Sequence, residues 1–78
     1  MKVLLTQKEQ DIVNLIVKFN HSNREIAERL DMPLCTVEVY INMIYRASNM
    51  SVPSHYKRTE LVRGIRDGDI VIVDKPLS

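Results

Sequence analysis

The sequence has little of what several classes of protein need. It contains one cysteine and no tryptophan among 78 residues, so no intramolecular disulfide framework can form and one small hydrophobic core must hold the fold together. One cysteine and two histidines cannot complete a common structural zinc site. No apolar run approaches the roughly 20 residues of a membrane span. We expect one domain, residues 1–78, in the reducing cytoplasm, without a metal, another cofactor or a membrane.

An excess of one charge sign is also missing. Eleven basic and ten acidic residues leave a formal net charge of +1, and hydrophobic residues make up 45% of the chain. This balance is typical of a globular domain and excludes a disordered one. The acidic residues are solitary or stand in helix caps, and Ser54 beside His55 is a sequence neighbour, not a triad. We therefore expect no catalytic residues and no enzyme.

Capping residues and apolar spacing predict the first helices. Thr6 and Ser22 each begin a capping box, with a glutamate three residues later. The apolar stripe behind Thr6 predicts a helix over about 7–19, and a shorter stripe behind Ser22 predicts a second helix. Asp31–Pro33 then predicts a tight turn, because the residue before a proline avoids helical geometry.

Two further helical segments and a strand are predicted in the second half. Apolar spacing indicates a third helix over about 34–48, a loop over 49–57, and a fourth short helix opening near Thr59. The β-branched run Ile70–Val73 predicts a strand. Its candidate partner within the chain is Lys2–Leu5, and the alternative is a second copy of the chain.

Two capped helices, a turn and a longer helix stand in the order of a helix-turn-helix. The local residues resemble the LuxR/GerE-type helix-turn-helix domain of bacterial transcription regulators. The resemblance starts at Leu5–Thr6 and centres on the run Ser-Asn-Arg-Glu-Ile-Ala at 22–27. It continues through Thr36–Val37, Tyr45–Arg46 and Arg58–Val62.

The resemblance implies a mainly α fold of four helices, with a core over about 5–66 and a strand-like tail at 69–74. It implies no cofactor, a third helix that reads double-stranded DNA, and a homodimer formed through Leu61, Val62 and Ile65 of the fourth helix. We expect Glu38, Tyr40 and Asn42 near bases. The expected phosphate contacts are Thr36, Arg46, Lys57 and Arg58.

The sequence departs from this family where DNA affinity is concerned. The family usually has lysine at the positions of Cys35, Glu38 and Ala47, histidine at Tyr40, and a capping serine at Pro33. The formal charge over 34–48 is zero, and phosphate neutralisation supplies most non-specific affinity for DNA. Positive charge is found instead between residues 52 and 66, where four cations stand against one acid: Lys57, Arg58, Arg63 and Arg66 against Glu60.

Two functions remain open at this point. The first is a DNA-binding transcriptional regulator that acts as a homodimer. The second is a protein-interaction module on a degenerate helix-turn-helix fold, which binds another transcription regulator and inhibits or modulates it. The first needs Arg46, Lys57 and Arg58 on the same side as the third helix. The second predicts a hydrophobic patch or an open strand edge there, or on the fourth helix.

Overall fold

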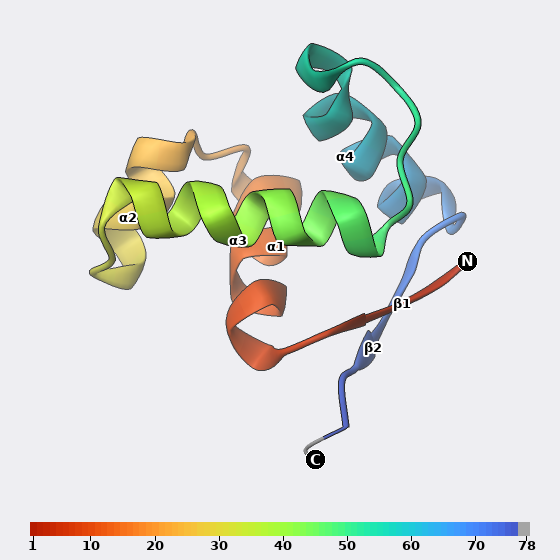
Figure 1. Ribbon diagram of the computed structural model, residues 1–78, viewed down its shortest axis with the longest axis horizontal. Coiled ribbons are helices and arrows are strands. Elements are labelled where there is room, and N and C mark those ends of the chain that lie inside the picture. Colours follow the sequence, from red (N-terminus) through yellow and green to blue (C-terminus); the bar gives the residue numbers. More distant parts are fainter. Residues whose placement is uncertain (77–78) are drawn as a thin grey trace.

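The computed structural model describes residues 1–76, and the last two residues of the predicted domain lie outside them. The elements follow in the order β1 (Lys2–Leu5), α1 (Gln7–Phe19), α2 (Asn23–Leu30), α3 (Leu34–Ala47), η1 (Ser54–Tyr56), α4 (Lys57–Asp67) and β2 (Val71–Asp74). Figure 1 shows α3 crossing the molecule over α1, with α2 near its start and α4 above its second half in this view. The mainly helical fold and the pairing of the two chain ends confirm the sequence-based prediction.

Both predicted capping boxes form, and they set where α1 and α2 begin. The backbone N–H of Thr6 donates to Glu9 Oε1 at 2.8 Å, and that of Ser22 donates to Glu25 Oε1 at 2.9 Å. Both helices end on a residue in the left-handed conformation, Asn20 after α1 and Asp31 after α2. Local hydrogen bonds thus fix the turns on either side of α2.

The core is shared by every element because the inner stripe of α3 lies at its centre. Val37, Ile41 and Ile44 are buried at successive turns of this helix. They belong to one apolar cluster with side chains from β1, α1, α2 and α4, namely Val3, Leu5, Ile12, Val13, Ile16, Ile26, Ala27 and Leu61. Burial of this stripe leaves the opposite side of α3 facing outward.

The two strands form a parallel pair that joins the ends of the described chain. Lys2 pairs with Val71 and Leu5 with Asp74, and the N–H of Val71 donates to the Met1 carbonyl at 2.8 Å. Val3 and Leu5 are buried against the helices, whereas Leu4 is 51% exposed on the outer side of the sheet. The intrachain partner predicted for the Ile70–Val73 run is therefore the one used.

The fourth helix begins earlier than the sequence suggests. The N–H of Tyr56 donates to the Pro53 carbonyl at 2.9 Å, closing η1, and the chain passes directly into α4 at Lys57. Gly64 lies inside α4, where a Cβ would come within 2.6 Å of Ile70 Cδ1. Gly68 ends the helix at φ 83°. The contact with Ile70 explains a glycine at a buried helical position.

The capping box at the start of α2 can be tested by titrating the Glu25 carboxyl. Hydrogen bonds from the Ser22 backbone and side chain lower the pKa of Glu25. A lowered pKa in the folded state means that this contact stabilises the fold above the ordinary glutamate pKa. The contribution is lost as pH falls through the lowered value.

We expect Ser22→Ala to raise the pKa of Glu25 toward its ordinary value, because the side-chain contact is lost. The same change should lower the free energy of unfolding by about 1 kcal/mol, as loss of an N-cap does. Carboxyl ¹³C titration and urea denaturation measure the two effects. An unchanged Glu25 pKa would contradict the capping role.

Candidate nucleic-acid interface

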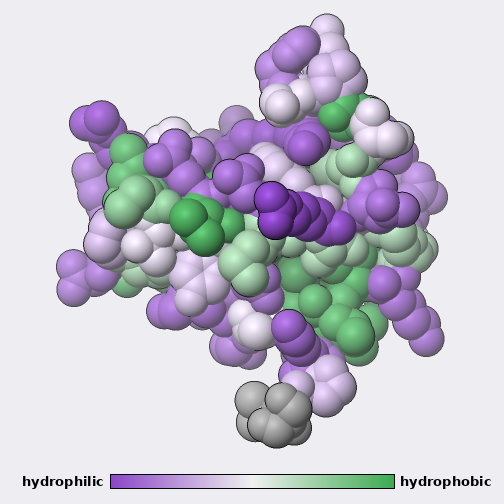
Figure 2. All heavy atoms as spheres, viewed as in Figure 1, coloured by the Kyte–Doolittle hydropathy of each residue, from purple (hydrophilic) through white to green (hydrophobic). Residues whose placement is uncertain are grey.

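The outward side of α3 forms a ridge of four residues spaced by four, three and four positions. They are Cys35, Val39, Asn42 and Arg46, and all four are exposed. Met43 lies beside them and is 48% exposed, while Val39 is 58% exposed. Figure 2 views this face, where green hydrophobic spheres lie along α3 and continue over the strands, with purple hydrophilic spheres between them. We call these five residues the α3 ridge.

The structure places the predicted residues of α3 in two groups. Glu38, Asn42 and Arg46 are exposed, as a groove-facing role requires. Thr36 is partly buried, and Tyr40 is partly buried against the core. Tyr40 thus stands at the border of the outward face.

Sequence reasoning missed Val39 and Met43, although a signal was present. Both stand on the helical side opposite the buried stripe, one turn apart, and the family resemblance drew attention to charged and polar positions instead. Their exposure makes the centre of the ridge apolar. An apolar centre changes which ligand chemistry this face can recognise.

The first turn of α3 lacks a side-chain cap. Pro33 occupies the N-cap position and makes no side-chain hydrogen bond. The backbone N–H of Thr36 donates to the Pro33 carbonyl at 3.1 Å. The N–H groups that precede it point out of the helix start, which is where helices accept phosphate oxygens.

Positive charge gathers at the other end of α3. Lys57 Nζ lies 5.9 Å from the centre of the Tyr45 ring, a cation–π arrangement. Burial raises the pKa of Tyr45, opposed by the charge of Arg58. Lys57 is therefore held next to the last turns of α3, where Arg46 is exposed. Both cations thus belong to the end of α3, Arg46 on the helix itself and Lys57 through the ring of Tyr45.

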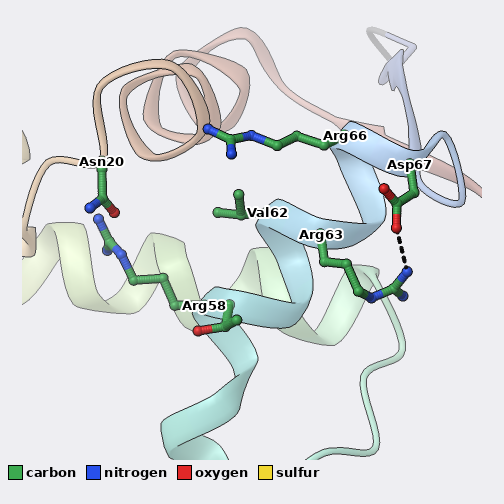
Figure 3. A pocket seen from close by; sticks show the side chains of 7 residues that line it. Asn20, Arg58, Val62, Arg63, Arg66 and Asp67 are labelled. Carbon is green, nitrogen blue, oxygen red and sulfur yellow. Dashed lines mark hydrogen bonds and ion pairs between the residues drawn. The ribbon is translucent and has the colours of Figure 1, made fainter.

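The third cation, Arg58, is used inside the molecule. Its Nη1 donates to Asn23 Oδ1 at 3.2 Å, which ties the start of α4 to the start of α2. In Figure 3 its side chain extends toward Asn20 across a cavity of about 420 Å³ that Val62 also lines. Arg58 is half-buried. This contact between helices engages Nη1, and the phosphate contact expected of Arg58 stays a prediction.

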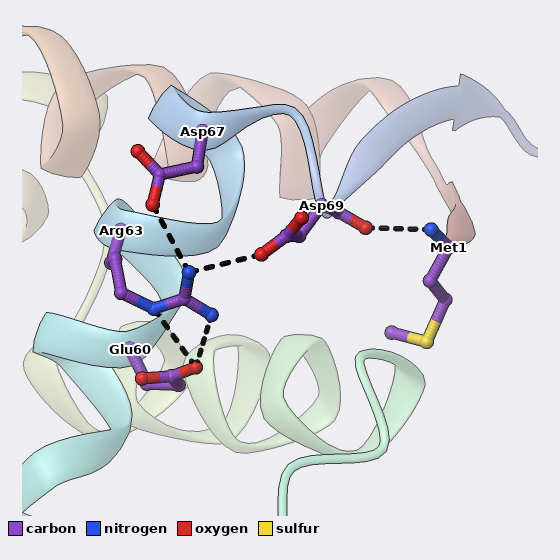
Figure 4. Close-up of polar contacts among 5 residues, drawn as sticks. All are labelled: Met1, Glu60, Arg63, Asp67 and Asp69. Atoms are coloured by element: carbon purple, nitrogen blue, oxygen red, sulfur yellow. Dashed lines mark hydrogen bonds and ion pairs between the residues drawn. The ribbon is translucent and has the colours of Figure 1, made fainter.

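The remaining basic residues of α4 are also engaged. The Arg63 guanidinium contacts three carboxylates, with Nε 3.1 Å from Glu60 and Nη1 3.1 and 3.0 Å from Asp67 and Asp69 (Figure 4). Its hydrogen bonds to Glu60, Asp69 and Asp67 raise the pKa of Arg63 further. Arg66 Nη2 donates to the Val17 carbonyl at 3.2 Å. Within the basic segment predicted over 52–66, Arg63 is thus paired with carboxylates, while Arg66 is held by a neutral carbonyl and keeps its charge.

One residue of the predicted dimer surface needs correction. Leu61 is fully buried in the core, with 0% of its surface exposed, because it faces α1 and α3 rather than solvent. It cannot contact a partner chain in this fold. Val62 and Ile65 are partly buried, so a dimer contact on α4 rests on these two.

Comparison with known proteins finds no matching family model, no matching curated protein and no matching solved structure. Within residues 1–76, no helix is long and apolar enough to cross a membrane. Over the same residues, no group of three or more His, Cys, Asp or Glu side chains could hold a metal ion. The proposals below therefore rest on the geometry of this chain and on the resemblance of its sequence.

The Asn23–Arg58 contact can be tested by removing the acceptor. We expect Asn23→Ala to lower the free energy of unfolding by about 1 kcal/mol, the usual value of one hydrogen bond, measured by urea denaturation. Asn14→Ala on the exposed side of α1 is the matched control and should change stability by a few tenths of a kcal/mol. Equal losses of stability from the two substitutions would show that the Asn23–Arg58 hydrogen bond does not stabilise the fold.

The assignment of Leu61 to the core makes a second prediction. Leu61→Ala should lower the free energy of unfolding by about 2–5 kcal/mol, because a cavity replaces a fully buried side chain. Val62→Ala, on the neighbouring and less buried position, should cost clearly less. Thermal unfolding followed by circular dichroism compares the two variants. A smaller loss of stability in Leu61→Ala than in Val62→Ala would show that Leu61 does not belong to the core.

Proposed function

We propose that this chain is a DNA-binding transcriptional regulator of the helix-turn-helix kind that places α3 in the major groove. The observation that carries the proposal is the α3 ridge, which stands opposite the buried stripe of the same helix and which no described element covers. The capped α2 and the turn at Asp31–Pro33 hold α3 in position. A helix presented in this way has the geometry that enters a groove.

Anchoring groups at both ends of the ridge support the same proposal. At the start of α3, Thr36 and the uncapped backbone N–H groups suit a phosphate oxygen. At its end, Arg46 and the nearby Lys57 suit a second phosphate. We assign the four helices to the LuxR/GerE-type fold, on the resemblance of residues 22–27 and Thr36–Val37, and place a homodimer contact at Val62 and Ile65. The regulator would act in the cytoplasm.

The small number of cations near the α3 ridge determines how strongly DNA binding should depend on salt. Two cations per chain near the ridge give a slope of log affinity against log salt of about −2 per chain, because each neutralised phosphate contributes about −0.9. Non-specific affinity is then low. Discrimination between sequences must come from contacts to the base edges.

A second candidate function is favoured by one observation, the apolar surface of α3. Val39 and Met43 are both exposed, and exposed apolar residues gathered on one face mark interaction surfaces. On this view the face docks on another transcription regulator and modulates it. The two functions differ in whether duplex DNA binds at all.

Fluorescence anisotropy with a labelled duplex, at low and then moderate salt, tests the proposal. Arg46→Ala and Lys57→Ala should each weaken binding by a similar factor on all sequences and should reduce the salt slope by about 1. Lys75→Ala, an exposed lysine beyond β2, is the matched control and should leave binding unchanged.

Absence of binding to any duplex at low salt would overturn the DNA-binding proposal in favour of the protein-interaction module. Equal losses from Lys75→Ala and Lys57→Ala would also count against it, because the attraction would then follow total charge and not the α3 surface.

A further inference from the structure

The middle of the α3 ridge lacks the side chains that read guanine. No lysine or arginine occurs from Leu34 to Tyr45, whereas arginine and lysine make the commonest specific contact, to guanine O6 and N7. What the ridge offers there is Val39, 58% exposed, Met43, 48% exposed, and the exposed amide of Asn42. Two apolar groups and one amide therefore define the chemistry of its centre.

This chemistry matches one kind of base pair. In the major groove, thymine presents a C5-methyl group that apolar side chains contact, and adenine presents a donor and an acceptor that an asparagine amide pairs with. Guanine and cytosine present no methyl group. An apolar side chain facing their polar edges would displace water without replacing its hydrogen bonds.

The spacing of the three side chains fits neighbouring base pairs. Val39 and Met43 are one turn apart, which is a rise of about 6 Å along the helix axis. This is near two steps of about 3.4 Å along the duplex. Asn42 lies between them on the outward side. The three residues can therefore address two or three consecutive base pairs.

Glu38 adds discrimination against guanine. Its exposed carboxylate stands beside the ridge and accepts hydrogen bonds only, so it can accept from the amines of adenine or cytosine, while the major-groove edge of guanine carries acceptors only. The two edges repel each other. Rejection of the wrong base by an unpaired charge is a common source of specificity.

We propose that α3 recognises A·T base pairs in the major groove, with Val39 and Met43 on thymine methyl groups and Asn42 on adenine. This inference rests on the proposed function and names the class of DNA sequence that the chain selects. A protein docked on the same apolar residues is the competing occupant. Arg46 and Lys57 at the end of the ridge favour the duplex, because they complement phosphates.

The experiment first selects duplexes from a randomised library with the whole chain at low salt and sequences those retained. We expect enrichment of consecutive A·T pairs. The most enriched duplex is then made with deoxyuridine in place of thymidine, which removes the methyl group and keeps the pairing edge. We expect affinity to fall about fourfold for each contacted methyl, the value of one buried carbon group.

Two variants assign the effect to the ridge. Val39→Ala should bind the thymidine duplex several-fold more weakly and lose the sensitivity to deoxyuridine at the thymine that Val39 contacts, about fourfold, while the sensitivity that is due to Met43 remains. Val71→Ala is the matched control, a valine of similar exposure on β2, and should retain the full sensitivity. Circular dichroism checks that both variants fold.

Each outcome is decisive. A·T enrichment with a deoxyuridine penalty that is smaller in Val39→Ala than in Val71→Ala supports the inference. Enrichment of G·C pairs, or equal binding of the thymidine and deoxyuridine duplexes, overturns the inference while leaving DNA binding in place. Failure to retain any duplex at low salt overturns the proposed function, and the inference with it, and points to a protein occupant.

Discussion

Burial of one stripe of α3 is the constraint on which the rest of the structure depends. Val37, Ile41 and Ile44 fill the centre of the only sizeable core that a chain of this length can build. Because α1, α2 and β1 pack against α3, this helix cannot rotate about its axis without exposing the stripe. The identity of the outward residues is therefore set by the inward ones, and the composition of the ridge follows from core packing.

The charges of the chain are arranged as much for stability as for binding. Arg63 is surrounded by three carboxylates, Arg58 joins α4 to α2, and Arg66 reaches the end of α1. These exposed or half-exposed contacts each contribute modestly, as surface ion pairs do. The three carboxylates offset the charge of Arg63, whereas the neutral acceptors of Arg58 and Arg66 orient these cations without offsetting their charge. A face with few cations and an apolar centre then gains more from matching its ligand closely than from general attraction to phosphate.

Local features of the sequence predicted the helices well because the interactions that fix them span only a few residues. The boxes at Thr6 and Ser22 are complete within four residues, and the left-handed Asn20 follows directly on α1. The destinations of the arginines were not predictable in this way. Arg58 meets an acceptor 35 residues away, and Arg63 binds Asp69 only because the chain turns at Gly68. Leu61 was misjudged because apolar spacing shows which residues share a face, but not whether that face meets the core.

The parallel pairing of β1 with β2 has a consequence for how the chain folds. The paired residues Lys2 and Val71 lie at nearly the largest separation that the described chain allows, and closing so long a loop costs entropy before any contact repays it. The helices, stabilised by their own caps, can form and assemble first, so the sheet closes last and opens first. The amide groups of β2, a strand without a buried residue, then exchange with solvent before those of β1, whose Val3 and Leu5 belong to the same core as α3. The carboxyl-terminal strand is thus the part of the sheet that opens first.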